Sequence, residues 1–183
     1  MPEPKQVFDF SQDQQYLVML PGDTYADRLL DLCKSLDRSF DSVCYVTLVK
    51  MLQSIVQSFE THGINYNKFE FIDACTETVV KRFLPSKKAI YIDAPNALTD
   101  ILLAISRTLD SKKTPILLFD SVSVLLIYND QKTVSKFVHA LTTMLRSKGV
   151  KGVLACLASD DSAGAISQIE PFFDRVIRLQ ETR

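Results

Sequence analysis

The stretch Ala89–Leu126 reads AIYIDAPNALTDILLAISRTLDSKKTPILLFDSVSVLL and contains the pattern that decides the fold. Its first residues, Ala89–Ile92, form a short run typical of a strand, and Asn96 is a candidate cap for a helix whose apolar residues recur every three or four positions. Pro115–Phe119 is the most apolar of the expected strands and ends at Asp120, which predicts a central strand. A strand, a helix and a strand in this order predict parallel pairing through a right-handed crossover.

The same alternation extends in both directions from this stretch. The further expected strands are Tyr16–Leu20, Val43–Leu48, Phe69–Ile72, Val150–Leu157 and Val176–Leu179. Expected helices follow Thr24 as a possible N-cap, run from Met51 to a stop at Gly63, and run from Asp130 to a stop at Gly149. The pattern predicts the α/β class, as a three-layer α/β/α sandwich with a mainly parallel central sheet. We expect one domain over residues 14–180, preceded by a flexible segment at residues 1–13.

Length and composition agree with one globular domain. The chain has 183 residues, of which 46% are hydrophobic and 23% charged, with a net charge of −1. Without an excess of positive charge, binding to nucleic acid is not expected. No apolar run approaches the length of a membrane span and no signal peptide is recognised, so we expect a cytoplasmic protein without a membrane anchor. The cysteines Cys33, Cys44, Cys75 and Cys156 each lie in an apolar run and are expected to be buried free thiols.

Carboxylates gather where the expected strands end. In a parallel sheet these ends share one edge, so Asp73, Asp93, Asp120 and Asp160 could lie together and resemble a metal or phosphoryl site. The alternative is that each one caps a helix or stabilises a turn. The sequence leaves both interpretations open.

The stretch Ala89–Leu126 resembles the KaiC-type branch of the RecA ATPase family. In that family an apolar strand ending in Asp-Ser forms the Walker B segment, whose Asp helps to hold nucleotide-bound magnesium, and Asp120 and Ser121 match it. The order of the later strands and helices also agrees. The resemblance implies a RecA-like, P-loop NTPase fold, with ATP and magnesium as the ligands of working members.

The phosphate-binding motif of such members, G-x-x-x-x-G-K-[ST], would follow the first strand. The chain has Gly22-Asp23-Thr24-Tyr25-Ala26-Asp27-Arg28-Leu29 there, in which only Gly22 fits and Arg28 replaces the lysine. The family also has an acidic pair after the second strand, where this chain has Leu48-Val49-Lys50. We therefore predict a pseudo-ATPase with no catalytic residue, no metal and no cofactor. Weak candidates for residual nucleotide binding are Gly22, Arg28, Asp120 and Ser121.

The leading hypothesis is thus a catalytically inactive module that binds another protein or copies of itself. One alternative is a regulator that still binds ATP weakly, and another is an unrelated enzyme that uses Asp73, Asp93 and Asp120. A basic segment with Lys81, Arg82, Lys87 and Lys88 could contact an acidic partner or nucleic acid, although a solvated loop is the favoured interpretation.

Overall fold

A computed structural model of the protein describes residues 8–75, 89–158 and 163–179. Within these residues, seven parallel strands form one sheet in the order β4-β3-β2-β5-β6-β1-β7. The strands are β1 (Gln15–Pro21), β2 (Val43–Thr47), β3 (Phe69–Asp73), β4 (Ala89–Tyr91), β5 (Ile116–Asp120), β6 (Lys151–Ala158) and β7 (Arg175–Arg178). β5 lies in the middle of the sheet, as its apolar sequence predicts.

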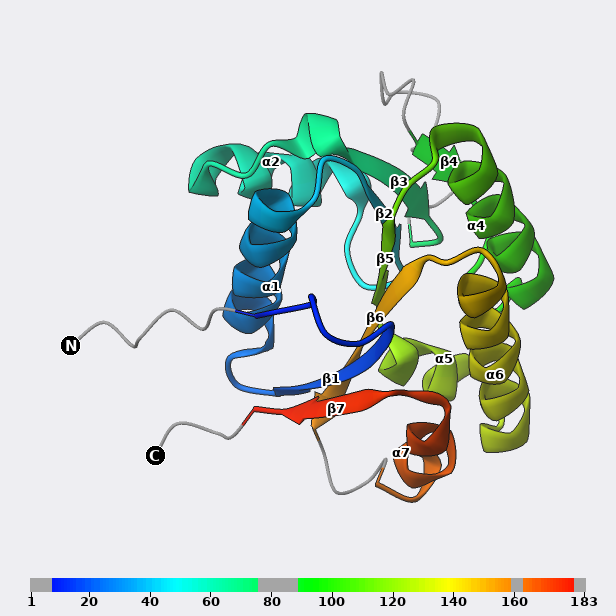
Figure 1. Ribbon diagram of the computed structural model, residues 1–183. Helices are drawn as coiled ribbons and strands as arrows, with labels where there is room; N and C mark the ends of the chain where they lie inside the picture. The colour runs from blue at the N-terminus through cyan, green and yellow to red at the C-terminus, as the bar shows by residue number, and fades with distance from the viewer. Residues whose placement is uncertain (1–7, 76–88, 159–162, 180–183) are drawn as a thin grey trace.

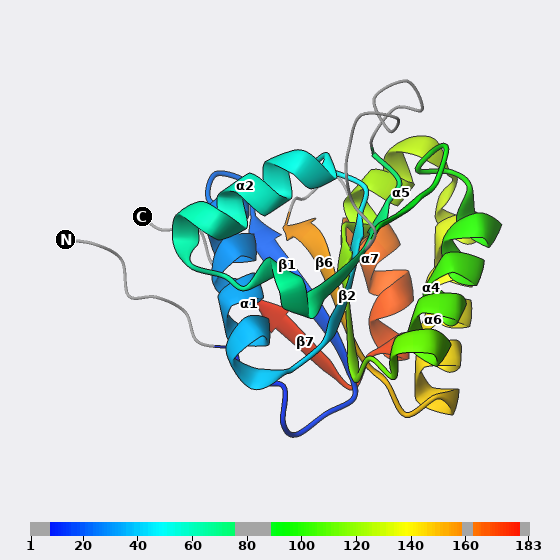
Figure 2. The same ribbon diagram turned by 90° about the horizontal axis from the view of Figure 1, so that it is seen from above.

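Helices cover both faces of the sheet and complete three layers (Figure 1). One face carries α1 (Tyr25–Ser39) and α2 (Leu52–His62), and the other carries α4 (Leu98–Lys112), α5 (Val122–Tyr128), α6 (Gln131–Ser147) and α7 (Ala163–Ile169). Figure 2 shows the sheet from above, with the two helical layers on either side of it. Short 3-10 turns occur at η1 (Tyr66–Lys68) and η3 (Glu170–Phe172). The predicted α/β class and three-layer architecture are confirmed.

The central strands are buried on both faces, so their alternating side chains enter two separate cores. In β5, Leu117 and Phe119 pack with α4 to α7, whereas Ile116 and Leu118 pack with α1 and α2. Because side chains alternate along a strand, Asp120 faces the α1 and α2 layer. This orientation places the carboxylate of the Walker B-like sequence beside the start of α1.

All seven strands agree with the sequence prediction to within one residue at each end. The helices α5 and α7 were not predicted from the sequence. Asp130 caps α6 as expected, since its carboxylate accepts a hydrogen bond from the backbone N–H of Thr133 at 2.9 Å. Thr24 lies at the N-cap position of α1, as predicted, although its side chain makes no capping bond. The prediction for Asn96 was wrong, because the N-cap of α4 is Ala97. Gly63 and Gly149 follow α2 and α6 with positive φ angles of 69° and 66°, as helix-terminating glycines do.

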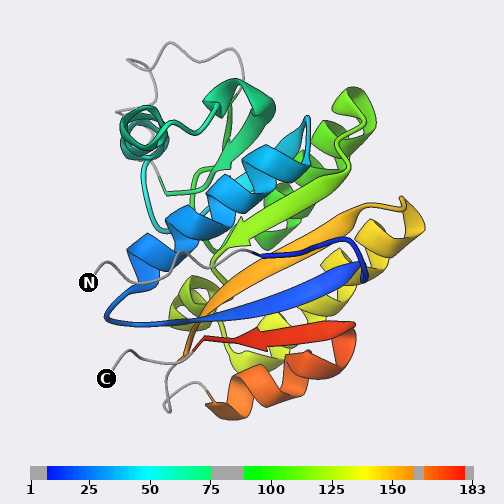
Figure 3. The ribbon, with the colours of Figure 1, turned by 60° about the vertical axis from the view of Figure 1, so that its left-hand side comes forward.

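The packed part of the chain begins before residue 14, the boundary expected from the sequence. Phe8 and Phe10 are 5% and 3% exposed and belong to the core under α1 and α2. The Phe10 ring meets Tyr16 of β1 edge to face at 5.0 Å, and the backbone N–H of Phe8 donates to Ser35 Oγ of α1 at 3.3 Å. Figure 3 shows this segment running beside β1. Residues 8–13 thus add an apolar layer to the domain.

Two features of the sequence lie outside the described residues, namely the basic segment with Lys81, Arg82, Lys87 and Lys88, and Asp160. The described helices include none with the length and apolar character needed to cross a membrane.

Candidate functional site

The candidate site is the edge of the sheet where β1, β2, β3 and β5 end. Thr47 at the end of β2 lies opposite Asp73 of β3 on one side and Asp120 of β5 on the other. The two carboxylate-bearing residues are therefore two strands apart, about 10 Å between backbones at the usual strand spacing. β1 is separated from β5 by β6, so the loop that begins at Gly22 lies a similar distance from Asp120.

Asp120 is completely buried, and two tyrosine hydroxyls donate hydrogen bonds to it. The Tyr25 hydroxyl donates to Oδ1 at 2.6 Å and the Tyr45 hydroxyl donates to Oδ2 at 3.2 Å. Tyr25 is the first residue of α1, and Tyr45 lies on the neighbouring strand β2. Both carboxylate oxygens are thus engaged by phenols that come from different elements.

Burial raises the pKa of Asp120 to about 6, an effect that the hydrogen bonds from Tyr25 and Tyr45 and the charge of Lys50 partly offset. Burial and the negative charge of Asp120 also raise the pKa values of both phenols well above their ordinary value. At neutral pH the two tyrosines therefore remain protonated donors, and the carboxylate is mostly ionised.

Asp73 is also buried, but it has a different structural role. Its Oδ2 accepts the backbone N–H of Leu52 at 3.0 Å and its Oδ1 accepts that of Cys75 at 2.9 Å. The carboxylate at the end of β3 therefore caps the start of α2, which supports the capping interpretation for this residue. Asp93 is exposed, and the described residues include no group of three or more His, Cys, Asp or Glu side chains that could hold a metal ion.

The four weak candidates for nucleotide binding come from three segments, which follow β1, lie on α1 and end β5. Ser121 directly follows Asp120, to which it is joined by a cis peptide bond, and it is 3% exposed. Gly22 is exposed at the end of β1, two strands away from Asp120. Arg28 lies on α1, where its guanidinium is 3.9 Å from the carboxylate of Asp31 one helical turn further on.

The residues missed by the sequence analysis are Tyr25 and Tyr45. Periodicity assigns them to the buried faces of a helix and a strand, and their aromatic rings do lie there. Periodicity does not predict that their hydroxyls meet at Asp120, because that contact depends on the order of the strands. A buried tyrosine does need a hydrogen-bond partner, and this requirement is the signal that could have found them.

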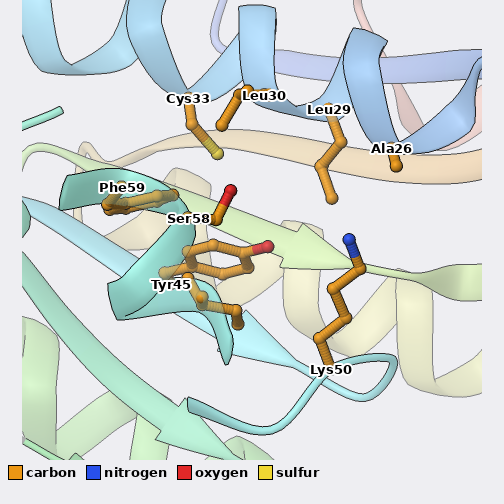
Figure 4. A pocket seen from close by; sticks show the side chains of 9 residues that line it. Ala26, Leu29, Leu30, Cys33, Tyr45, Lys50, Ser58 and Phe59 are labelled. Atoms are coloured by element: carbon orange, nitrogen blue, oxygen red, sulfur yellow. The ribbon is translucent and has the colours of Figure 1, made fainter. Parts of the chain in front are cut away.

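A hollow of about 290 Å³, open to solvent, lies between α1 and α2 above Tyr45. It is lined by Ala26, Leu29, Leu30, Cys33, Tyr45, Lys50, Ile55, Ser58 and Phe59. In Figure 4 the Lys50 side chain reaches from the loop after β2 toward α1, beside the Tyr45 ring. Leu29, Cys33, Tyr45, Ile55 and Phe59 are each at most 5% exposed. The hollow is therefore shallow and exposes little apolar surface.

The family described as a family of unknown function (DUF7504) matches residues 53–179, more than half of the chain. The chain belongs to this family. The matched region contains Asp120 and Ser121 but not β1, α1 or β2, so it does not include the loop after Gly22. No curated protein matches the chain in sequence.

The structure of the chain is similar to 217 chains of solved structures, and these matches identify its fold. One is the crystal structure of a KaiC-like protein from the hyperthermophilic archaeon Pyrococcus horikoshii OT3, with a TM-score of 0.65 and 15% sequence identity. The match covers 93% of this chain and 73% of the archaeal one. The chain therefore has a KaiC/RecA-like fold. At this identity the similarity establishes the fold alone.

Proposed function

We propose that this chain is a catalytically inactive KaiC/RecA-like ATPase-fold domain that acts as a protein-interaction or regulatory module. The observation that carries the proposal is the segment after β1, in the position where working relatives bind phosphate. It presents exposed carboxylates at Asp23 and Asp27, and its one cation, Arg28, lies beside Asp31 on the same helix. Negative side chains in this position oppose a triphosphate.

The residues present do not fit a magnesium-bound nucleotide. Leu29 occupies the position at which the motif has a magnesium-binding hydroxyl, and both oxygens of Asp120 already accept phenol hydrogen bonds. Gly22 supplies only one of the glycines that let backbone N–H groups surround a phosphate.

The loop after β2 supports the same proposal. Relatives have an acidic pair there to activate water, whereas this chain has Leu48-Val49-Lys50. Thr47 Oγ1 donates to the backbone carbonyl of Lys50 at 2.8 Å and so closes the loop on itself. The loop after β2 thus provides no acidic general base, and the segment Gly22–Leu29 provides no lysine.

Exposed apolar side chains support the interaction role. Four of them, Val49, Met51, Ile127 and Tyr128, belong to segments that follow the ends of β2 and β5, and two others, Ile90 and Leu103, lie on β4 and α4. Ile127 is the most exposed of them, at 75%. Where exposed apolar side chains form one contiguous patch, the patch is typical of a surface that contacts other proteins.

Steady-state ATP hydrolysis by the purified chain tests the loss of catalysis. We expect a rate at background, with no difference between the wild type and Asp120→Ala. Hydrolysis above background that disappears in Asp120→Ala would refute the proposal.

Self-association is tested separately by light scattering over a range of protein concentrations. If copies of the chain bind one another through the exposed apolar residues, Ile127→Lys lowers the average mass, whereas Gln131→Lys, at an exposed polar position, leaves it unchanged. A monomer at every concentration would remove self-association and leave a different protein as the partner.

A further inference from the structure

Asp120 occupies the position that the family resemblance assigns to a magnesium ligand, but its observed partners are two phenols. We infer that Asp120 is the acceptor of a two-phenol lock, formed with Tyr25 and Tyr45, which fastens the first turn of α1 to β5 and β2 in place of holding a metal ion. The inference concerns the role of one buried carboxylate and does not depend on the proposed interaction function.

The first half of the lock crosses a strand. α1 follows β1, and β6 lies between β1 and β5, so the bond from Tyr25 joins the segment after β1 to a strand two positions away in the sheet. The resulting oxygen-to-oxygen distance of 2.6 Å lies in the short range typical of a phenol that donates to an ionised carboxylate. Hydrogen bonds of this kind are about twice as strong as those between neutral groups.

The start of α1 has no side-chain N-cap hydrogen bond. Thr24 lies at the N-cap position, but its hydroxyl donates to Asp23 Oδ1 at 3.3 Å and makes no capping bond. Tyr25, the first helical residue, donates its hydroxyl hydrogen bond to Asp120. We conclude that this long-range bond stabilises the helix start that a capping residue would otherwise stabilise.

The second half of the lock comes from β2. The Tyr45 ring packs against Phe59, Phe69 and Phe71, with ring centroids 6.3, 6.5 and 5.8 Å away. These neighbours restrict the ring and keep its hydroxyl 3.2 Å from Asp120 Oδ2. A magnesium ion held directly by Asp120 would have to share the buried carboxylate oxygens with the two phenols.

Hydrogen exchange of the backbone amides in residues 25–32 tests the lock. Tyr25→Phe keeps the ring and removes the hydroxyl, and we expect exchange in the first turns of α1 to become roughly tenfold faster or more. The control is Tyr128→Phe, which removes the hydroxyl of a residue that is 56% exposed, and it should leave exchange in α1 unchanged. Unchanged exchange in α1 for Tyr25→Phe would overturn the inference.

A second arm addresses the metal directly and uses magnesium chloride without nucleotide. We expect magnesium to leave exchange at residues 119–123 unaltered in the wild type. Slower exchange there that Asp120→Asn abolishes would show that the carboxylate binds the ion and would overturn the inference. If Asp120→Asn does not fold, magnesium-dependent protection of the wild type would overturn it equally. ATP hydrolysis is not measured in either arm, so failure here is distinguishable from failure of the proposed function.

Discussion

Replacing Asp120 by Asn should change how the stability of the protein depends on pH. Burial raises the pKa of this carboxyl from an ordinary 3.8 to about 6, so the folded protein holds the proton more tightly than the unfolded chain. A group with a raised folded-state pKa contributes stability that is fully present below its unfolded pKa and is lost as the pH rises through its folded pKa. A shift of about two units corresponds to about 3 kcal/mol, lost between about pH 4 and about pH 7. Asn does not titrate, so the variant lacks this loss.

The measurement is urea unfolding of the wild type and Asp120→Asn at a series of pH values. The other titrating groups contribute equally to both proteins, so the difference between the two free energies of unfolding isolates Asp120. As the pH rises over that interval, we expect the wild type to lose about 3 kcal/mol of unfolding free energy relative to the Asn variant. The phenols of Tyr25 and Tyr45 have raised pKa values and do not titrate there. A difference that stays constant with pH, or that moves in favour of the wild type, would refute the reasoning.

Three further substitutions test the packing of the fold by thermal or urea unfolding. Gly152→Ala should lower the free energy of unfolding by about 1 to 3 kcal/mol, because the added Cβ would lie 2.2 Å from a buried side-chain oxygen of β1. The control is Gly164→Ala, whose added Cβ would have no atom within 4 Å and should cost nothing. Equal stabilities of the two variants would contradict the packing at β6. Asp130→Ala should lower the melting temperature by about 2 to 4 °C, because α6 loses its capping side chain. Asn96→Ala should leave the melting temperature unchanged, since Asn96 does not occupy the N-cap position of α4. A larger loss for Asn96→Ala would reverse that assignment. Phe10→Ala should cost about 3 to 5 kcal/mol because the ring is 3% exposed in the core, and a cost below about 1 kcal/mol would show that the domain begins after it.

The sequence predicted the architecture because the signals for it are local. Strands such as β5 are buried on both faces and are therefore unbroken apolar runs, and the intervening helices carry apolar residues every three or four positions. The short helices were missed for the same reason. α5 and α7 have only seven residues each, too few for a periodic pattern to stand out from an apolar strand or a loop.

The candidate site was predicted only in part. Asp120 was correctly placed at the end of the central strand, because a carboxylate after an apolar run marks where the strand ends. Its partners were not predicted, since they lie 95 and 75 residues away along the chain. The strand order that brings β2 beside β5, and leaves β1 two positions from β5, follows from tertiary packing and from no local pattern. Aromatic residues on apolar faces were therefore interpreted as core residues, which describes their rings but not their hydroxyls.

The most direct test of the central claim, that a KaiC/RecA-like fold here no longer binds the nucleotide, is urea unfolding with and without millimolar magnesium–ATP. A ligand that binds only the folded state at 100 times its dissociation constant adds about 2.7 kcal/mol to the free energy of unfolding. We predict no change in the unfolding midpoint of the wild type. A stabilisation of that size, present in the wild type and absent in Asp120→Asn, would contradict the account.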